Sequence, residues 1–342
     1  MTLRDVAGGA VPLAEVVRGD LVESVHLGHL VLLDGVRGAD DPLLVLGDAD
    51  AVVWPRSSVK PFQAVAMLRN GLDLPARLLA LAAASHDGRP EHVAGTQEIL
   101  ARAGLDASAL RNTPDMPLHG ATALAWQAEH GGPSSLTQNC SGKHAAMLAT
   151  CVAAGWDTRT YLDPAHPLQV AVREAVAELT GVPVEHATVD GCGAPLFSTT
   201  PRGLARGVAR LAAAPSRTPG SPEAAVAGAM SSFPWMVAGP ERDATRAMRA
   251  VPGLVAKDGA DGVYVAGLPD GGALALKVLD GASRPRPALL AAALRRLGAA
   301  AVPGADVDAL DALGAVPVLG GGHPVGAVRV VEALAGPRRE PS

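Results

Sequence analysis

Lysine is scarce in this chain of 342 residues. Lysine and arginine together number 29, and four of these are lysine, so arginine accounts for 29 minus 4, or 25. A chain that uses arginine for its solvated positive charges can keep lysine for tasks that a guanidinium cannot perform, such as losing a proton when buried. The lysines therefore indicate proton transfer or metal ligation; they are Lys60, Lys143, Lys257 and Lys277.

Aromatic residues and net positive charge are also lacking. Aromatic residues make up 3% of the chain and hydrophobic residues 48%, so Ala, Val and Leu must fill most of the core. A formal net charge of −5 gives no basic footprint for nucleic acid, and the few aromatic residues disfavour a stacking platform for single strands. We therefore expect no nucleic-acid partner.

Cysteine is rare, and long apolar runs are missing. The three cysteines, Cys140, Cys151 and Cys192, are an odd and sparse set, which favours free thiols in a reducing compartment over a disulfide framework. No apolar run approaches the roughly 20 residues that span a membrane, and the first residues lack the pattern of a signal peptide. We expect a cytoplasmic protein without a membrane partner.

Apolar periodicity predicts strands towards both ends of the chain and helices between them. Two strands joined near Gly28 are predicted over 21–34, and further strands at 50–54, 254–257, 262–268, 273–279 and 326–330. Helices are predicted at 63–70, 75–84, 90–103, 143–154, 167–180, 202–213, 222–231 and 287–299. The pattern indicates an α+β fold with one sheet built from both termini and an inserted helical lobe.

The domain boundaries follow from this pattern. We expect a single catalytic unit over 14–335, in which residues of about 14–56 and 250–335 form the sheet layer. Residues of about 60–249 form the helical lobe. Residues 1–13 and 336–342 are predicted to be flexible ends.

The first motif that carries chemistry is a serine three residues before a lysine, Ser57 and Lys60. On a helix this spacing puts both side chains on one face, where a neutral Lys60 could take the proton of Ser57. Pro61 supports a helix that begins here, because proline is tolerated in the first turn. The spacing favours Ser57 over Ser58 as the nucleophile. The alternative is a capping serine followed by a surface lysine.

Two further segments bear a serine and a lysine. Ser85-His86-Asp87-Gly88 ends an apolar helix and is either a second serine facing a cleft or a capping turn. Lys257-Asp258-Gly259 lies on or beside a strand, where the lysine could donate to a substrate carboxylate or to a serine. The alternative for this segment is an ordinary strand-ending turn.

Two glycine-containing turns each carry a thiol. They are Asn139-Cys140-Ser141-Gly142-Lys143-His144 and Asp190-Gly191-Cys192-Gly193. Two thiolates from separate turns could hold zinc, with nitrogen from Lys143 or His144 and a carboxylate from Asp190. The alternative is a pair of reduced, inert cysteines, since no Cys-x-x-Cys pair exists.

Taken in order, these segments resemble the bacterial asparaginase II family, typified by the inducible rhizobial asparaginase. The resemblance extends to Glu23-Ser24-Val25-His26 and to Lys277-Val278-Leu279-Asp280-Gly281, although no role follows for Lys277. One departure lies at Arg111-Asn112-Thr113-Pro114-Asp115, where the family usually has a Cys-Gly-Pro-like segment.

The resemblance implies a fold similar to the serine β-lactamases and glutaminases, with an antiparallel sheet flanked by helices. It implies the nucleophile pair Ser57 and Lys60, a supporting pair Ser85 and Lys257, and a homodimer. It implies zinc on Cys140, Lys143 and Cys192, where the metal helps to position substrate and is not required for the nucleophilic step. The substrate-binding residues that it implies are Arg56, His86, Asn139, Gly142, His144, Asp190 and Gly191.

The sequence thus predicts an amidohydrolase that converts L-asparagine to L-aspartate and ammonia through an acyl-enzyme. Within enzymes, the alternative is a related serine amidase acting on glutamine or a lactam. From another class, the alternative is a non-catalytic amino-acid-binding or regulatory protein, in which a broken pair of catalytic residues would be expected. Both pairs are intact in this sequence.

Overall fold

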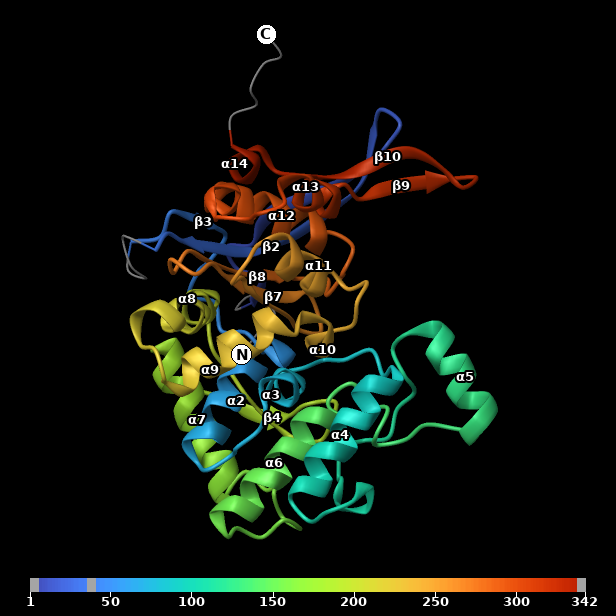
Figure 1. Ribbon diagram of the computed structural model, residues 1–342. Coiled ribbons are helices and arrows are strands. Elements are labelled where there is room, and N and C mark those ends of the chain that lie inside the picture. Colours follow the sequence, from blue (N-terminus) through green and yellow to red (C-terminus); the bar gives the residue numbers. More distant parts are fainter. Residues whose placement is uncertain (1–5, 36–40, 337–342) are drawn as a thin grey trace. The chain divides into compact units, whose positions relative to one another are not determined.

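The computed structural model describes residues 6–35 and 41–336, which form two compact units. The first contains the described residues of 1–58, 199–213 and 246–342, and the second contains 59–198 and 214–245. Figure 1 shows that the first unit carries the main sheet and the second is mainly helical.

An eight-stranded antiparallel sheet forms the centre of the first unit. Its order is β6-β7-β8-β2-β1-β10-β9, and β3 pairs with β2. The strands are β1 (Val11–Arg18), β2 (Leu21–Leu33), β3 (Leu44–Leu46), β6 (Val255–Asp258), β7 (Val263–Gly267), β8 (Ala273–Val278), β9 (Pro317–Gly320) and β10 (His323–Val330). The predicted α+β fold, with an antiparallel sheet drawn from both ends of the chain, is confirmed.

One strand prediction is wrong at Gly28. Leu21–Leu33 is a single strand, β2, which pairs with β1, β3 and β8. A Cβ at Gly28 would lie 2.0 Å from the backbone oxygen of Lys277 on β8. The glycine is therefore needed for close approach of two strands, and it makes no turn.

Other boundaries also differ from the sequence prediction. Residues 50–54 form no strand, because only Val53 makes a bridge, to Thr199. Strand β1 begins at Val11, within the segment 1–13 that the sequence predicts to be a flexible end. The predicted strand at 326–330 is the second half of β10, which forms a hairpin with β9 through Gly321 and Gly322, both at positive φ.

Helices complete the first unit. α12 (Arg286–Arg296), α13 (Val307–Gly314) and α14 (Glu332–Ala335) lie on one face of the sheet, as Figure 1 shows. The part of α8 (Pro201–Arg217) that belongs to this unit packs on β7, where a Cβ at Gly267 would lie 2.7 Å from Val208 O. α11 (Asp243–Ala250) also contributes residues from 246 onward.

The second unit is built around α6 (Ser141–Ala154). Its first eight residues are all buried, because α3 (Ala76–Ala82), α4 (Pro90–Arg102) and α2 (Lys60–Arg69) pack around it. The helix ends at Gly155 in the left-handed conformation, a common C-terminal stop. The other elements are α5 (Gly120–His130), α7 (Pro167–Thr180), α9 (Pro222–Ser232), α10 (Pro234–Val237), β4 (Ala187–Val189) and β5 (Pro195–Phe197).

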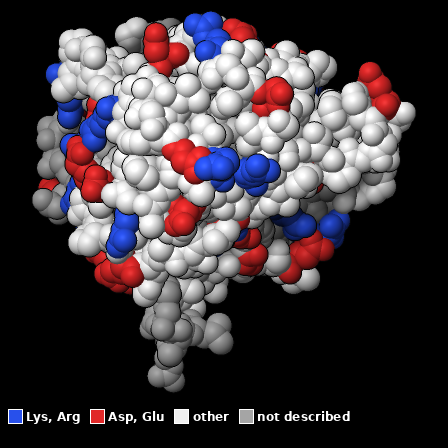
Figure 2. All heavy atoms as spheres, turned by 90° about the horizontal axis from the view of Figure 1, so that it is seen from below, with Lys and Arg blue, Asp and Glu red and all other residues white. Residues whose placement is uncertain are grey.

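The core agrees with the composition. Buried hydrophobic side chains are mostly Ala, Val and Leu, and the aromatic exceptions are Phe62, Tyr161, Phe197 and Tyr264. Among the described residues, no helix has the length and apolarity to cross a membrane. On the face drawn in Figure 2, basic and acidic side chains are interspersed.

Candidate active site

The predicted nucleophile Ser57 lies in a 3₁₀ turn, Arg56–Val59, in the first unit. The turn is fixed by Ser58, whose backbone N–H and Oγ both donate to Pro55 O at 3.2 and 2.7 Å. Helix α2 follows directly at Lys60, with Pro61 in its first turn. The helix start predicted here is therefore present.

Arg56, which precedes Ser57, has a backbone conformation that is unusual for its residue type. Its φ is 51°, and Asp261 at 53° is the other described non-glycine residue with positive φ. Such a conformation costs about 1–3 kcal/mol and persists where the surrounding structure enforces it. The Arg56 guanidinium forms an ion pair with the Asp261 carboxylate, and Lys277 Nζ donates to Asp261 O.

Lys257 is fully buried on β6 in the first unit. Its Nζ donates to Asp258 Oδ1 at 2.8 Å and to Asp258 O at 2.7 Å. The following Gly259 lies against the serine turn, since a Cβ there would be 2.8 Å from Pro55 O. The Lys257-Asp258-Gly259 segment and the Ser57 turn are therefore neighbours within this unit.

Lys60 belongs to the second unit and is 1% exposed, so the surface-lysine alternative is wrong. Its Nζ donates to Ala84 O at 2.5 Å, to Ser85 Oγ at 3.0 Å and to Cys140 Sγ at 3.0 Å. An ammonium has three donors, so each can meet one acceptor. Lys60 thus brings the second serine and the first thiol together around one amine.

The thiols of Cys140 and Cys192 are buried and packed together with Ala194. A hydrogen bond from Cys192, with the charges of Lys60 and Lys143, lowers the pKa of Cys140 well below its ordinary value. The same hydrogen bond and burial raise the pKa of Cys192. These shifts favour the proton on Cys192 and the negative charge on Cys140.

The predicted zinc ligands lie together in the second unit. Lys143 Nζ is 3.2 Å from Cys192 Sγ, and Cys192 is hydrogen-bonded to Cys140. Burial alone would lower the pKa of Lys143, but the nearby Cys192, Cys140 and Asp190 charges raise it. Two sulfurs and one amine are donors that suit zinc once the amine loses its proton. Within 6–35 and 41–336, no group of three or more His, Cys, Asp or Glu side chains is placed to hold a metal ion.

Asp190 begins the turn that carries Cys192. Its N–H donates to Ala194 O and its carbonyl accepts from Gly193 N, both at 2.8 Å, while Oδ1 accepts from Gly191 N at 2.8 Å. Gly191 itself is exposed. The short β4–β5 ladder, in which Val189 pairs with Pro195, holds the two ends of this turn together.

The loop that departs from the family pattern contacts both thiol segments. Buried Asn112 donates to Gln138 Oε1, and that same oxygen accepts from Cys140 N. Thr113 N donates to Cys192 O at 3.3 Å. The departure at Arg111–Asp115 therefore lies where the loop braces the predicted metal ligands.

His144 is fully buried on α6 one residue after Lys143. Its Nδ1 is 2.8 Å from Tyr161 Oη, which also accepts from Arg111 N at 3.1 Å. Burial, with the charges of Lys143 and Lys60, lowers the pKa of His144 well below its ordinary value. Its Nε2 has no hydrogen-bond partner among the described residues.

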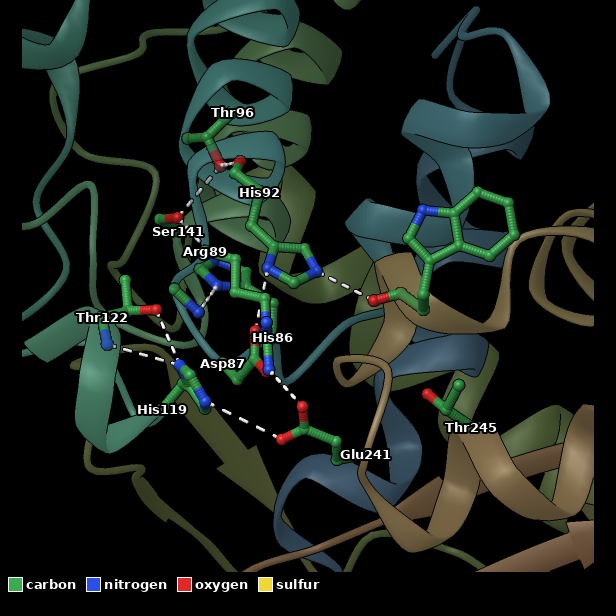
Figure 3. A network of polar contacts seen from close by, with 12 residues as sticks. His86, Asp87, Arg89, His92, Thr96, His119, Thr122, Ser141, Glu241 and Thr245 are labelled. Atoms are coloured by element: carbon green, nitrogen blue, oxygen red, sulfur yellow. Dashed lines mark hydrogen bonds and ion pairs between the residues drawn. The ribbon is translucent and has the colours of Figure 1, made fainter.

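His86 connects the Ser85 segment to the start of α6 (Figure 3). Its N–H donates to Asn139 O, and its Nδ1 accepts from Gly88 N. Burial, with His92 and Lys60, lowers the pKa of His86 well below its ordinary value, so Nε2 carries the hydrogen that is donated to Ser141 Oγ at 2.8 Å. Ser141 in turn lies 3.0 Å from Thr96 Oγ1, which donates to His92 O.

A charged network continues from the same segment. His92 Nδ1 lies 3.1 Å from Asp87 Oδ1, and the other Asp87 oxygen accepts from Arg89. Arg89 also pairs with Glu241, which lies 3.7 Å from His119 (Figure 3). This network holds the loop 85–89 to α4 and to the loop before α11.

The remaining predicted residues have local structural contacts. Asn139 Oδ1 lies 3.2 Å from Cys140 Sγ. A Cβ at Gly142 would lie 2.6 Å from Leu81 O, so this glycine permits α6 to approach α3. These contacts neither require nor exclude the predicted substrate-binding roles.

Sequence reasoning missed Asp261, Asp87 and His92. Asp261-Gly262 has the composition of a turn, but the sequence does not reveal that the aspartate, as well as the glycine, takes a positive φ. The partners of Asp87 and His92 include Glu241, which is far away in sequence, so no local motif marks the network.

Comparisons with known proteins identify one family over most of the chain. A family model described as L-asparaginase II matches residues 14–330. No curated protein matches. The crystal structure of Mglu in its tris and glutamate form is 14% identical, with a TM-score of 0.34, and the match covers 84% of this chain and 57% of that chain. A β-lactamase from Mycobacterium bovis is 15% identical, with a TM-score of 0.31, 75% of this chain and 88% of that chain being covered.

Proposed function

This chain belongs to the L-asparaginase II family of amidohydrolases, and we propose that it converts L-asparagine to L-aspartate and ammonia. The observation that carries the proposal is the buried Lys60, whose Nζ lies 3.0 Å from both Ser85 Oγ and Cys140 Sγ. A lysine held by a hydroxyl and a thiol in a dry interior is suited to proton transfer.

The first chemical step is acyl transfer to Ser57. Lys60, three residues further along the chain, takes the proton of Ser57 in its neutral form, and Ser57 Oγ attacks the side-chain amide carbon. Backbone N–H groups near Ser57 hold the oxyanion that develops. The contact between Lys60 and Ser85 supports a route by which the proton moves on from the lysine.

The second step releases ammonia and then aspartate. Ser85 and Lys257 deliver a proton to the departing ammonia as the carbon–nitrogen bond breaks, which leaves a β-aspartyl ester on Ser57. Water hydrolyses this ester, and the proton returns to Ser57. Asp258, which accepts twice from Lys257, keeps the ammonium of that lysine oriented.

Zinc held by Cys140, Lys143 and Cys192 would supply a fixed positive charge that helps to position the substrate. Asp190, whose charge acts on Lys143, would orient water or substrate beside that group. Arg56, His86, Asn139, Gly142, His144 and Gly191 complete the proposed substrate-binding set. The buried Nε2 of His144, which has no hydrogen-bond partner among the described residues, supports a role for that residue in substrate contact.

Ammonia release tests the proposal. Purified protein is assayed with L-asparagine, L-glutamine and a β-lactam at matched concentrations. We expect kcat/KM for asparagine to exceed that for glutamine by at least tenfold. Preferred turnover of glutamine or the lactam would reassign the substrate, and no turnover of any of the three would leave the binding-protein alternative.

Two further proposals rest on the family and the sequence. We propose a homodimer, which light scattering of the purified protein tests directly. We also propose a cytoplasmic location, which fractionation of the source cells tests.

A further inference from the structure

We propose that Asp261 and Lys277 are positioning residues for Ser57, acting through Arg56. Arg56 and Asp261 are the two described non-glycine residues at positive φ, 51° and 53°, and their side chains form an ion pair with each other. The inference rests on the proposed role of Ser57 as nucleophile.

The ion pair links two strained turns of the same unit. Arginine has no side-chain preference for the left-handed region, whereas aspartate visits it more readily. Arg56 therefore needs an external restraint, and the Asp261 carboxylate supplies one. Because Arg56 immediately precedes Ser57, the backbone angles at residue 56 determine the direction in which the chain enters the serine turn.

Lys277 fixes Asp261, the partner of Arg56 in the ion pair. It lies on β8 opposite Val263 of β7, and its Nζ donates to the backbone oxygen of Asp261 in the turn between β6 and β7. Burial, followed by the nearby Arg56 charge, lowers the pKa of Lys277. A lysine beside an arginine is repelled by its positive charge. The hydrogen bond from Lys277 to the Asp261 carbonyl offsets this repulsion and holds the turn in place.

The two turns also meet through their backbones. A Cβ at Gly259 would lie 2.8 Å from Pro55 O and 3.3 Å from Ser58 N, so the Asp258–Gly262 turn leaves no space beside the serine turn. A chain of contacts thus runs from strand β8 through Lys277 and Asp261 to Arg56, the residue before Ser57. Small misplacement of a reacting atom can lower rates about 10²-fold, so this path is expected to act on kcat.

The test compares four variants of the protein. Lys277→Met keeps the side-chain length but removes the donor, and Asp261→Asn removes the charge while tolerating positive φ. Each single variant is expected to lower kcat about 10- to 100-fold, with KM within about twofold of wild type. The kcat of the double variant should be no lower than that of the less active single variant. Lys277→Arg, which keeps a donor, should recover part of kcat.

Arg18→Met is the matched control. Arg18 also pairs with a carboxylate, Glu23, and donates to a backbone oxygen, Leu319 O, but at the exposed hairpin end of the same sheet. This variant should retain kcat. Wild-type kcat in Lys277→Met, a change confined to KM, or losses that multiply in the double variant would overturn the inference.

A second measurement does not depend on catalysis. Arg56→Gly removes both the ion pair and the strain, so in the wild-type background the lost pair offsets part of the strain relief and the urea midpoint should rise only slightly. In the Asp261→Asn background only strain relief remains, and the same substitution should raise the midpoint. Equal shifts of the midpoint in both backgrounds would refute the positioning role. An inactive wild type that still shows the larger shift in the Asp261→Asn background would refute only the proposed function.

Discussion

Lys60 Nζ and Ser85 Oγ are joined by a 3.0 Å hydrogen bond between two buried side chains 25 residues apart in sequence. Lys60 starts α2 and Ser85 follows α3, so the packing of these two helices determines the contact. The sequence pairs Lys60 with Ser57 and Ser85 with Lys257. In the second unit Lys60 contacts Ser85, so the structure brings together one member of each predicted pair.

Replacing Lys60 by arginine tests the proposed base. Lys60→Arg keeps the charge, but a guanidinium does not lose its proton, and a planar group fits poorly among Ala84 O, Ser85 Oγ and Cys140 Sγ. We expect kcat for asparagine to fall about 10²- to 10⁴-fold. Arg69→Lys, at the exposed end of the same helix, is the control and should keep turnover. Near-normal turnover in Lys60→Arg would contradict the mechanism.

Metal content tests the thiol pair. Cys192→Ser removes one of the two sulfur donors, so elemental analysis should show that zinc falls from about one equivalent to a small fraction. Cys151→Ser is the control: Cys151 lies within α6, burial raises its pKa to about 11, and its removal should leave zinc unchanged. Fully active wild-type protein without zinc would reject the metal proposal.

Acid pH should weaken the Asp87 network. Burial alone would raise the pKa of Asp87, but hydrogen bonds from His92 and Arg89 hold it below its usual value of 3.8. A carboxyl whose folded pKa is lowered contributes stability above its unfolded pKa and loses it as pH falls through the folded value. Asp87→Asn should therefore lower the free energy of unfolding by about 2 kcal/mol at pH 5.5.

The pH dependence is measured by urea unfolding of both proteins. The difference between wild type and Asp87→Asn should shrink once the pH falls below about 3.8. Asp106→Asn is the control, because Asp106 is exposed and its lowered pKa comes from local contacts with Ser108. A difference for Asp87→Asn that stays constant down to pH 2.5 would show that its charge is not involved.

Glycine at position 142 can be tested against a second helical glycine. In Gly142→Ala the new methyl would lie 2.5 Å from Leu81 Cγ and 2.6 Å from Leu81 O, so α3 and α6 must separate. We expect the free energy of unfolding to fall by about 1–3 kcal/mol. Gly228→Ala, in α9 with nothing within 4 Å, should raise it by about 0.5–1 kcal/mol. Equal effects in the two variants would remove the packing explanation.

Part of the fold was accessible from the sequence. The alternation and β-branched residues of the C-terminal segments predict strands close to the observed Val255–Asp258, Val263–Gly267 and Ala273–Val278. These predictions succeed because turns rich in glycine separate the strands. The prediction at Gly28 fails because a glycine that permits close strand approach looks the same in sequence as one that makes a turn.

Helix α5 was missed for a related reason. Gly120–His130 has no buried residue, so no apolar stripe marks it in the sequence. Its ends are capped locally, by His119, which accepts from Thr122 N, and by Gly131 in the left-handed conformation. Its position is set by contacts that are not local: Asp115 and Ser134 pair across its base, and His119 N donates to Asp87 O. Such partners become neighbours only after the chain has folded.

The sequence by itself determined the family, the α+β class and the scarcity of lysine that directs attention to four positions, because composition and motif order are properties of the chain alone. Only the tertiary structure decided what each lysine contacts. Lys60 meets Ser85 and Cys140, Lys143 meets Cys192, and Lys257 meets Asp258. Lys277 reaches the Asp261 carbonyl. Most of these contacts join residues far apart in sequence, and packing of helices and strands brings them together.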